Sequence, residues 1–111
     1  GVPNLFACFG YINASWTLRA DLTSTYVCRV LNHMTQTKTS RCTPVLREID
    51  KDMPSQAFID GFTPGYIRRA AKIFPKQSDR LPWLNPQNYK KDKQMLRHDP
   101  LEDGVLTFSN H

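Results

Sequence analysis

The sequence lacks any apolar stretch that approaches the roughly 20 residues needed to cross a membrane as a helix. It also shows no charged N-terminal segment followed by a long apolar core, which is the pattern of a secretory signal. We therefore expect a protein without an integral membrane segment and with a cytoplasmic location.

Cysteine and histidine are scarce, and neither is clustered. The chain contains no Cys-x-x-Cys pair, no zinc-like spacing and no histidine beside a carboxylate at a catalytic spacing. The residues concerned are Cys8, Cys28, Cys42, His33, His98 and His111. We expect the cysteines to be small buried side chains in a reducing cytosol rather than disulfide partners. The sequence accordingly predicts no metal site and no catalytic acid, base or nucleophile.

The 111 residues allow one domain at most, with an ordinary composition of 40% hydrophobic and 23% charged residues. The net charge of +5 is concentrated between Gly61 and His98, where nine basic residues accompany two acidic ones. Such a region binds nucleic acid, an anionic membrane surface or a phosphorylated cofactor, or it forms the solvated side of a segment. Because no nucleic-acid-binding motif accompanies the charge, we favour the solvated surface.

The first third of the chain predicts one strand followed by one long helix. The run from Val2 to Phe9 is uncharged and lacks polar alternation, which is typical of a strand covered on both faces in a parallel sheet. Ser15 and Thr17 are candidate N-caps for a helix that fades near Thr35–Thr39. Its apolar stripe recurs every four residues, at Leu18, Leu22, Tyr26, Val30 and Met34. A strand and a helix without partners are half of a βαβ unit, so we expect a piece of a larger α/β protein.

The rest of the chain is less regular. Residues 41–55 are expected to be irregular, and Thr63-Pro64 is expected to start a helix that Pro75 ends. A proline-rich stretch then leads to a further helix over Gln87 to Arg97 and a short strand over Val105 to Phe108.

Four segments together carry a resemblance to a known family. They are PNLFACFGYINASWTLRADLTSTYVCRVLNHM, GFTPGYIRRAAKIFPKQSDRLPW, QNYKKDKQMLR and DGVLTFS. This combination resembles the C-terminal end of the class B, Baeyer–Villiger-type flavin-dependent monooxygenases, especially their ethionamide-activating subgroup. The resemblance covers essentially the whole chain.

The resemblance implies an α+β fragment of an α/β flavoprotein with two dinucleotide-binding domains. Residues 1–40 would be the final strand and helix of the FAD-binding domain, and residues 41–111 a C-terminal extension. The parent would bind FAD, use NADPH, and insert one oxygen atom from O2 into a ketone or a sulfur or nitrogen centre. The G-x-G-x-x-G fingerprints of the family are absent here, so the fragment alone is expected to be inactive and to bind no cofactor. Its expected partners are the rest of the parent chain and a small-molecule substrate, not nucleic acid.

The same resemblance assigns a flavin contact to the start of the long helix. In the family, this helix points its N-terminus at the pyrimidine side of the flavin, where N–H groups and the helix dipole stabilise negative charge. The matching positions are Asn13, Ala14, Ser15, Trp16, Thr17 and Leu18. The backbone N–H groups of Thr17 and Leu18 are the most specific candidates. Spacing alone favours an ordinary capped helix without a ligand, and the resemblance favours the flavin site.

Three further interpretations concern tryptophans, assembly and a rival function. Trp16 is expected to be a core residue rather than a wall of the substrate pocket, and Trp83 to anchor an irregular segment on the parent. The uncovered Val2–Phe9 strand of an isolated chain predicts self-association as a homodimer. The rival function is a free-standing module whose basic C-terminal half contacts an acidic partner or RNA.

Overall fold

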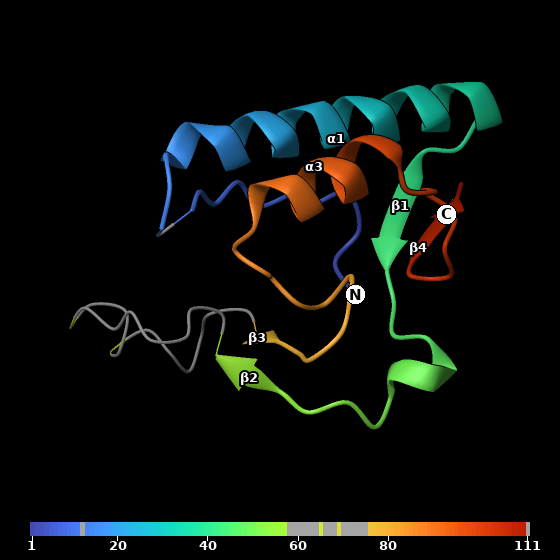
Figure 1. Ribbon diagram of the computed structural model, residues 1–111. Coiled ribbons are helices and arrows are strands. Elements are labelled where there is room, and N and C mark those ends of the chain that lie inside the picture. The colour runs from blue at the N-terminus through green and yellow to red at the C-terminus, as the bar shows by residue number, and fades with distance from the viewer. Residues whose placement is uncertain (12, 58–64, 66–68, 70–75, 111) are drawn as a thin grey trace.

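The computed structural model describes residues 1–11, 13–57, 65, 69 and 76–110 of the chain (Figure 1). Along this part the elements are α1 (Trp16–Thr37), β1 (Arg41–Pro44), the 3-10 turn η1 (Glu48–Asp50), β2 (Gln56–Ala57), β3 (Lys76–Gln77), α3 (Tyr89–His98) and β4 (Leu106–Ser109). Helices and short antiparallel strands occupy different parts of the molecule, so the chain is α+β. The helix expected between Thr63 and Pro75 falls almost wholly outside the described residues.

Helix α1 runs along one side of the molecule, and α3 packs against it (Figure 1). Leu22 and Val30 of the predicted apolar stripe are completely buried in α1, whereas Leu18 at the start of the stripe is 38% exposed. Leu96 contributes from α3 with 8% of its surface exposed. Burial of such side chains is worth roughly 1.5–3 kcal/mol each, which fixes this small core. Neither of these described helices combines the length and apolar character of a membrane span.

Helix α1 ends where the sequence predicts, within the Thr35–Thr39 segment. Lys38 follows the last helical residue with φ 56° and ψ 42°, a left-handed conformation. From this position its N–H donates to the carbonyl oxygens of Met34 and Thr35, which satisfies acceptors left over at the helix end.

Helix α3 confirms the prediction for residues 87–97, with bounds shifted by one or two residues. Asn88 is its N-cap, and the Asn88 side chain accepts a hydrogen bond of 3.1 Å from the Lys91 N–H. At the other end, the Arg29 guanidinium of α1 donates to the Leu96 carbonyl oxygen at 2.5 Å. Both ends of α3 are therefore held by side chains.

Two small antiparallel sheets complete the described fold. In the first, β1 pairs with β4 so that Cys42 lies opposite Phe108; in the second, β2 pairs with β3. The predicted closing strand is confirmed as β4, one residue later than expected. The expectation that residues 41–55 are irregular is wrong, because they contain β1 and η1. Strand β1 leaves little sequence signal, since it has four residues, only one buried side chain, and a partner far along the chain.

The prediction of a buried strand over Val2–Phe9 is wrong. The segment forms no strand, and Val2 and Leu5 are 59% and 67% exposed. Pro3 has no N–H to donate to a ladder, and Asn4 has a left-handed φ of 58° that breaks the extended run. These two consecutive residues explain why an apolar run does not extend as a strand.

Asn4 instead fastens the segment to the outer edge of β1. Its N–H donates to the Cys42 carbonyl oxygen and its Oδ1 accepts from the Cys42 N–H, both at 2.9 Å. Its Nδ2 also donates to the Ser40 carbonyl oxygen at 3.1 Å. One side chain and one peptide group thus bond to β1 on the side opposite β4.

The burial predicted for the cysteines holds only for Cys42 in β1. Cys8 and Cys28 are exposed, because the first lies on the segment that is not a strand and the second on the outer face of α1. All three are free thiols, as expected.

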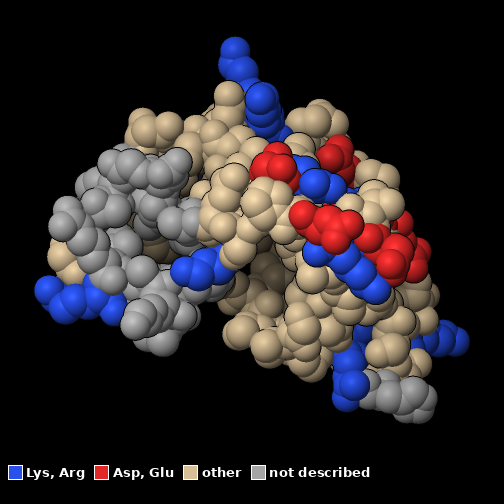
Figure 2. All heavy atoms as spheres, turned by 90° about the horizontal axis from the view of Figure 1, so that it is seen from below, with Lys and Arg blue, Asp and Glu red and all other residues tan. Residues whose placement is uncertain are grey.

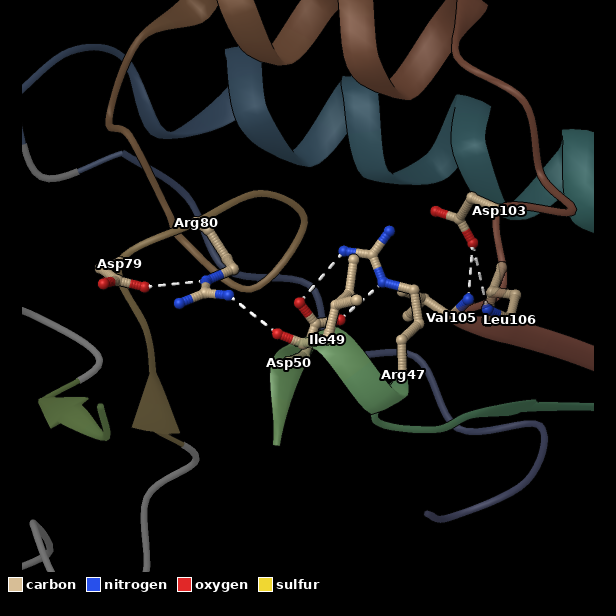
Figure 3. Close-up of polar contacts among 8 residues, drawn as sticks. All are labelled: Arg47, Ile49, Asp50, Asp79, Arg80, Asp103, Val105 and Leu106. Carbon is tan, nitrogen blue, oxygen red and sulfur yellow. Dashed lines mark hydrogen bonds and ion pairs between the residues drawn. The ribbon is translucent and has the colours of Figure 1, made fainter. Parts of the chain in front are cut away.

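A buried ion pair closes the turn after β1 (Figure 3). Arg47 donates through Nε to Asp50 Oδ2 at 2.6 Å and through Nη2 to Asp50 Oδ1 at 3.2 Å. The bound guanidinium holds the pKa of the buried Asp50 carboxyl below its ordinary value. Arg80 donates to the Ile49 carbonyl oxygen at 3.0 Å and to Asp79 at 3.1 Å, which ties the loop after β3 to η1.

Candidate functional site

The first turn of α1 lies at the surface, and residues 13–18 are all exposed. Ser15 occupies the predicted N-cap position, but its side chain makes no capping bond and its Oγ lies 3.0 Å from Thr17 Oγ1. The Leu18 N–H donates to the Ser15 carbonyl oxygen at 3.2 Å. The Thr17 N–H has no acceptor among the described residues. Of the two candidate N–H groups, the one of Thr17 is therefore the one available to donate to a ligand.

The turn that leads into α1 is closed by a tight contact between Gly10 and Trp16. A Cβ on Gly10 would lie 2.2 Å from Trp16 Cδ2, so this approach requires a glycine. The Phe9 ring lies on the same indole, with ring centroids 4.8 Å apart and planes at 55°. Trp16 nevertheless keeps 49% of its surface exposed, so the expectation of a core tryptophan is wrong. Its indole covers the backbone of the turn instead of entering the core between the helices.

A buried carboxylate joins this turn to α3. Asp92 is completely buried, and its Oδ2 accepts a hydrogen bond of 2.5 Å from the Tyr11 hydroxyl. Its Oδ1 lies 2.8 Å from Arg19 Nη1, on the fourth residue of α1. Burial, followed by the hydrogen bond to the carboxylate, raises the pKa of Tyr11 to about 12. The phenol therefore remains a neutral donor throughout the ordinary pH range.

A second polar contact comes from the residue before the α3 cap. Asn13 donates through Nδ2 to the Gln87 carbonyl oxygen at 3.2 Å. Gln87 has a left-handed φ of 51°, so its backbone conformation differs from that of the helix that follows it. The start of α3 thus contacts the turn before α1 at two separate points.

A cavity of about 320 Å³ opens beside the first turns of α1. This volume is near the lower limit of typical small-molecule sites. Its wall includes Cys8, Phe9, Arg19, Thr23, Trp83 and Met95. The wall combines apolar side chains with polar and charged ones, among them Arg19, Lys76 and Asn85, and it does not include Thr17.

The chemistry available at the α1 N-terminus is electrostatic. Its first turn carries no acidic residue, so the positive end of the helix dipole is not neutralised. An available N–H and an uncompensated helix dipole suit the anionic edge of a ring such as a reduced flavin. A diphosphate needs a glycine-rich loop, which the chain lacks. In the described part of the chain, no three His, Cys, Asp or Glu side chains converge as a metal-binding group.

The described Lys and Arg residues do not form a continuous charged surface on the face that Figure 2 shows. Lys and Arg side chains are dispersed there, and several adjoin Asp or Glu. Two of the basic residues lie beside carboxylates, Arg80 with Asp79 at 3.1 Å and Arg97 with Asp21 at 3.6 Å. The charges of these two described residues are thus compensated at the surface, and the solvated surface favoured for the whole basic region stays a prediction.

Sequence reasoning places the start of the long helix correctly, at Ser15, but misses the Asp92 network. The signal is present in the α3 segment, where Asp92 stands four residues before Leu96. Residues four apart share one helix face, and both of these side chains are buried. Asp92 is the one acidic residue of a lysine-rich helix and lies on its apolar face, which predicts that its carboxylate has a buried partner. Charge counting alone placed Asp92 with the solvated residues.

Comparison with known proteins finds relatives among the FAD-containing monooxygenases. The chain is 44% identical over 111 residues to the FAD-containing monooxygenase EthA of Mycolicibacterium smegmatis, which covers 100% of the chain and 22% of the relative. EthA of Mycobacterium tuberculosis is 41% identical over 98% of the chain and 22% of its own length. The probable FAD-binding monooxygenase AlmA of Acinetobacter baylyi is 40% identical over 96% of the chain and 21% of its own length.

No family model and no solved structure matches the chain. The chain spans about a fifth of the length of the curated relatives it matches. Over essentially its whole length, the chain is thus related to one segment of the FAD-containing monooxygenases.

Proposed function

We propose that the chain is the C-terminal part of an FAD-dependent monooxygenase that uses NADPH. In this proposal the parent inserts one oxygen atom from O2 into a ketone or a sulfur or nitrogen centre, and the chain alone is inactive. Residues 1–40 complete the FAD-binding domain, and residues 41–111 form an extension packed on it. The identity to several monooxygenases across almost the whole chain supports the family, and the resemblance supports the finer assignment.

Within this enzyme, residues Asn13–Leu18 would face the flavin ring. FAD, when bound, supplies the redox and oxygen chemistry, and the chain contributes position and charge stabilisation. The available Thr17 N–H at the positive end of α1 is the observation that carries this assignment. It would donate to negative charge that gathers on the pyrimidine side of the ring, while Ser15 and Trp16 hold the turn in shape.

The substitution Thr17→Pro in the full-length monooxygenase tests this role. Proline is tolerated in the first helical turn but has no N–H, so the flavin would lose one donor while the helix persists. We expect the rates of flavin reduction or of the oxygen reaction to fall on the order of 10²-fold, the usual effect of removing one donor to a developing anion. Stopped-flow absorbance of the flavin measures both rates.

Thr17→Ala is the matched comparison, because it removes the hydroxyl that faces Ser15 and keeps the N–H. Its effect should be much smaller than that of Thr17→Pro. Wild-type reduction and oxygen rates in a folded, FAD-loaded Thr17→Pro enzyme would refute the assignment of the α1 N-terminus to the flavin.

A further inference from the structure

We propose that Asp92 is the positioning residue that sets where the N-terminal turn of α1 lies, through Tyr11 on one side and Arg19 on the other. The inference rests on the proposed function, because the position of this turn matters for chemistry only if the turn faces the flavin. It assigns to α3, which bonds to Tyr11 before the turn and to Arg19 after it, a role in the flavin site.

The two partners of Asp92 bracket the candidate site in the sequence. Tyr11 precedes the Asn13–Leu18 segment and Arg19 directly follows it. One carboxylate therefore fixes both ends of the turn, with the hydroxyl of Tyr11 at 2.5 Å and Nη1 of Arg19 at 2.8 Å. Fixing the helix start through Arg19 and the preceding segment through Tyr11 holds the N–H groups of the first turn of α1 in one direction, which is what preorganised charge stabilisation requires.

Burial makes this carboxylate more than a surface ion pair. Asp92 has no exposed surface, whereas the Arg19 side chain is 19% exposed. A buried carboxylate that has lost a partner is strongly disfavoured, so the two contacts to Asp92 are mutually dependent. The segment before α1 and the first turns of α1 are consequently coupled to the position of α3.

The other contacts between the helices lie farther from the flavin-facing turn. Arg97 of α3 lies 3.6 Å from Asp21 of α1, whose side chain is 71% exposed. Arg29, three turns along α1, donates to the carbonyl oxygens at the C-terminal end of α3. These contacts hold the helices together, but neither bonds to the segment before Trp16. Asp21 therefore provides a matched control: an acid in one helix, a basic partner in the other, and no contact with the turn.

The test compares Tyr11→Phe, Asp92→Asn and Asp21→Asn in the full-length monooxygenase. Tyr11→Phe removes one hydroxyl and keeps the Arg19–Asp92 pair, so among the Tyr11 and Asp92 variants we expect it to destabilise the fold least. We expect it to slow flavin reduction about tenfold, with a KM for the reducing nucleotide within about twofold of wild type. Asp92→Asn should slow the reaction further, and both should shift the visible absorption bands of the bound flavin. Asp21→Asn should match wild type in rates and spectrum.

The outcomes separate this inference from the proposed function. If Thr17→Pro slows the flavin reactions and Tyr11→Phe changes only the melting temperature, the positioning role is wrong while the flavin site stands. If Thr17→Pro is without effect, both ideas fail. Equal changes in Asp21→Asn and Tyr11→Phe would show general loosening of the helix pair and would also overturn the inference. Should Asp92→Asn not fold, Tyr11→Phe decides alone.

Discussion

At the scale of single residues, Gly10, just before the candidate site, is the most tightly constrained of the described glycines. Its backbone lies against the Trp16 indole so closely that an added Cβ would fall within 2.2–2.7 Å of three ring atoms. No rearrangement of the methyl group avoids this contact, because it is fixed to the backbone. The indole must move, and with it the first residue of α1.

We expect Gly10→Ala to displace Trp16 and to lower the free energy of unfolding by about 1–3 kcal/mol, the usual cost of overpacking. The displacement should change tryptophan fluorescence, and chemical denaturation gives the free energy. Gly1→Ala is the control, because a Cβ there meets nothing within 4 Å. An unchanged emission spectrum together with wild-type stability would contradict this description of the turn.

At the scale of elements, the long helix, α3 and β4 were predictable because their signals are local. Leu22 and Val30 repeat at helical spacing, and Asn88 caps the helix that follows it. The failures concern segments whose conformation depends on distant partners or on one residue. Strand β1 exists through its pairing with β4, and the Val2–Phe9 run is broken by the conformation of Asn4. The spacing of apolar residues along the sequence reveals neither the distant pairing nor the conformation of a single residue.

The C-terminal end of α1 permits a stabilising substitution. Lys38 holds a left-handed conformation that costs an L-residue with a Cβ about 1–2 kcal/mol and costs glycine almost nothing. Lys38→Gly should therefore raise the free energy of unfolding by roughly 0.5–1 kcal/mol, after the extra unfolded-state entropy of glycine is subtracted. Thermal or urea unfolding measures the change. Lys38→Ala controls for loss of the charge and should not stabilise; a Lys38→Gly protein no more stable than Lys38→Ala would contradict the argument.

At the scale of the whole molecule, the candidate flavin contact is one edge of a site. The chain offers an N–H group and a helix dipole, but no glycine-rich loop for the diphosphate. The same division explains what the sequence could predict of the site. A helix N-terminus is recognised from Ser15 and Thr17, whereas the partners of the buried Asp92, Tyr11 and Arg19, become visible only when α1 and α3 are packed.

The isolated 111-residue chain should accordingly bind FAD weakly or not at all. Most of the affinity for a dinucleotide comes from contacts to its diphosphate and ribose, which these residues do not provide. Titration of FAD with the purified chain should leave flavin fluorescence unchanged, with free tryptophan and an unrelated basic protein as controls. Saturable quenching at micromolar chain concentration would contradict this expectation.

The bonds that Asn4 makes to β1 have a consequence for how copies of the chain meet. A strand at a sheet edge recruits a further strand through its outward N–H and C=O groups. On β1 the outward groups of Cys42 are both bonded to Asn4, and Pro44 has no N–H to offer. An incoming strand would find no ladder to extend at the β1 edge. Self-association at this edge would therefore depend on exposed apolar side chains such as Val2 and Leu5 rather than on β-augmentation.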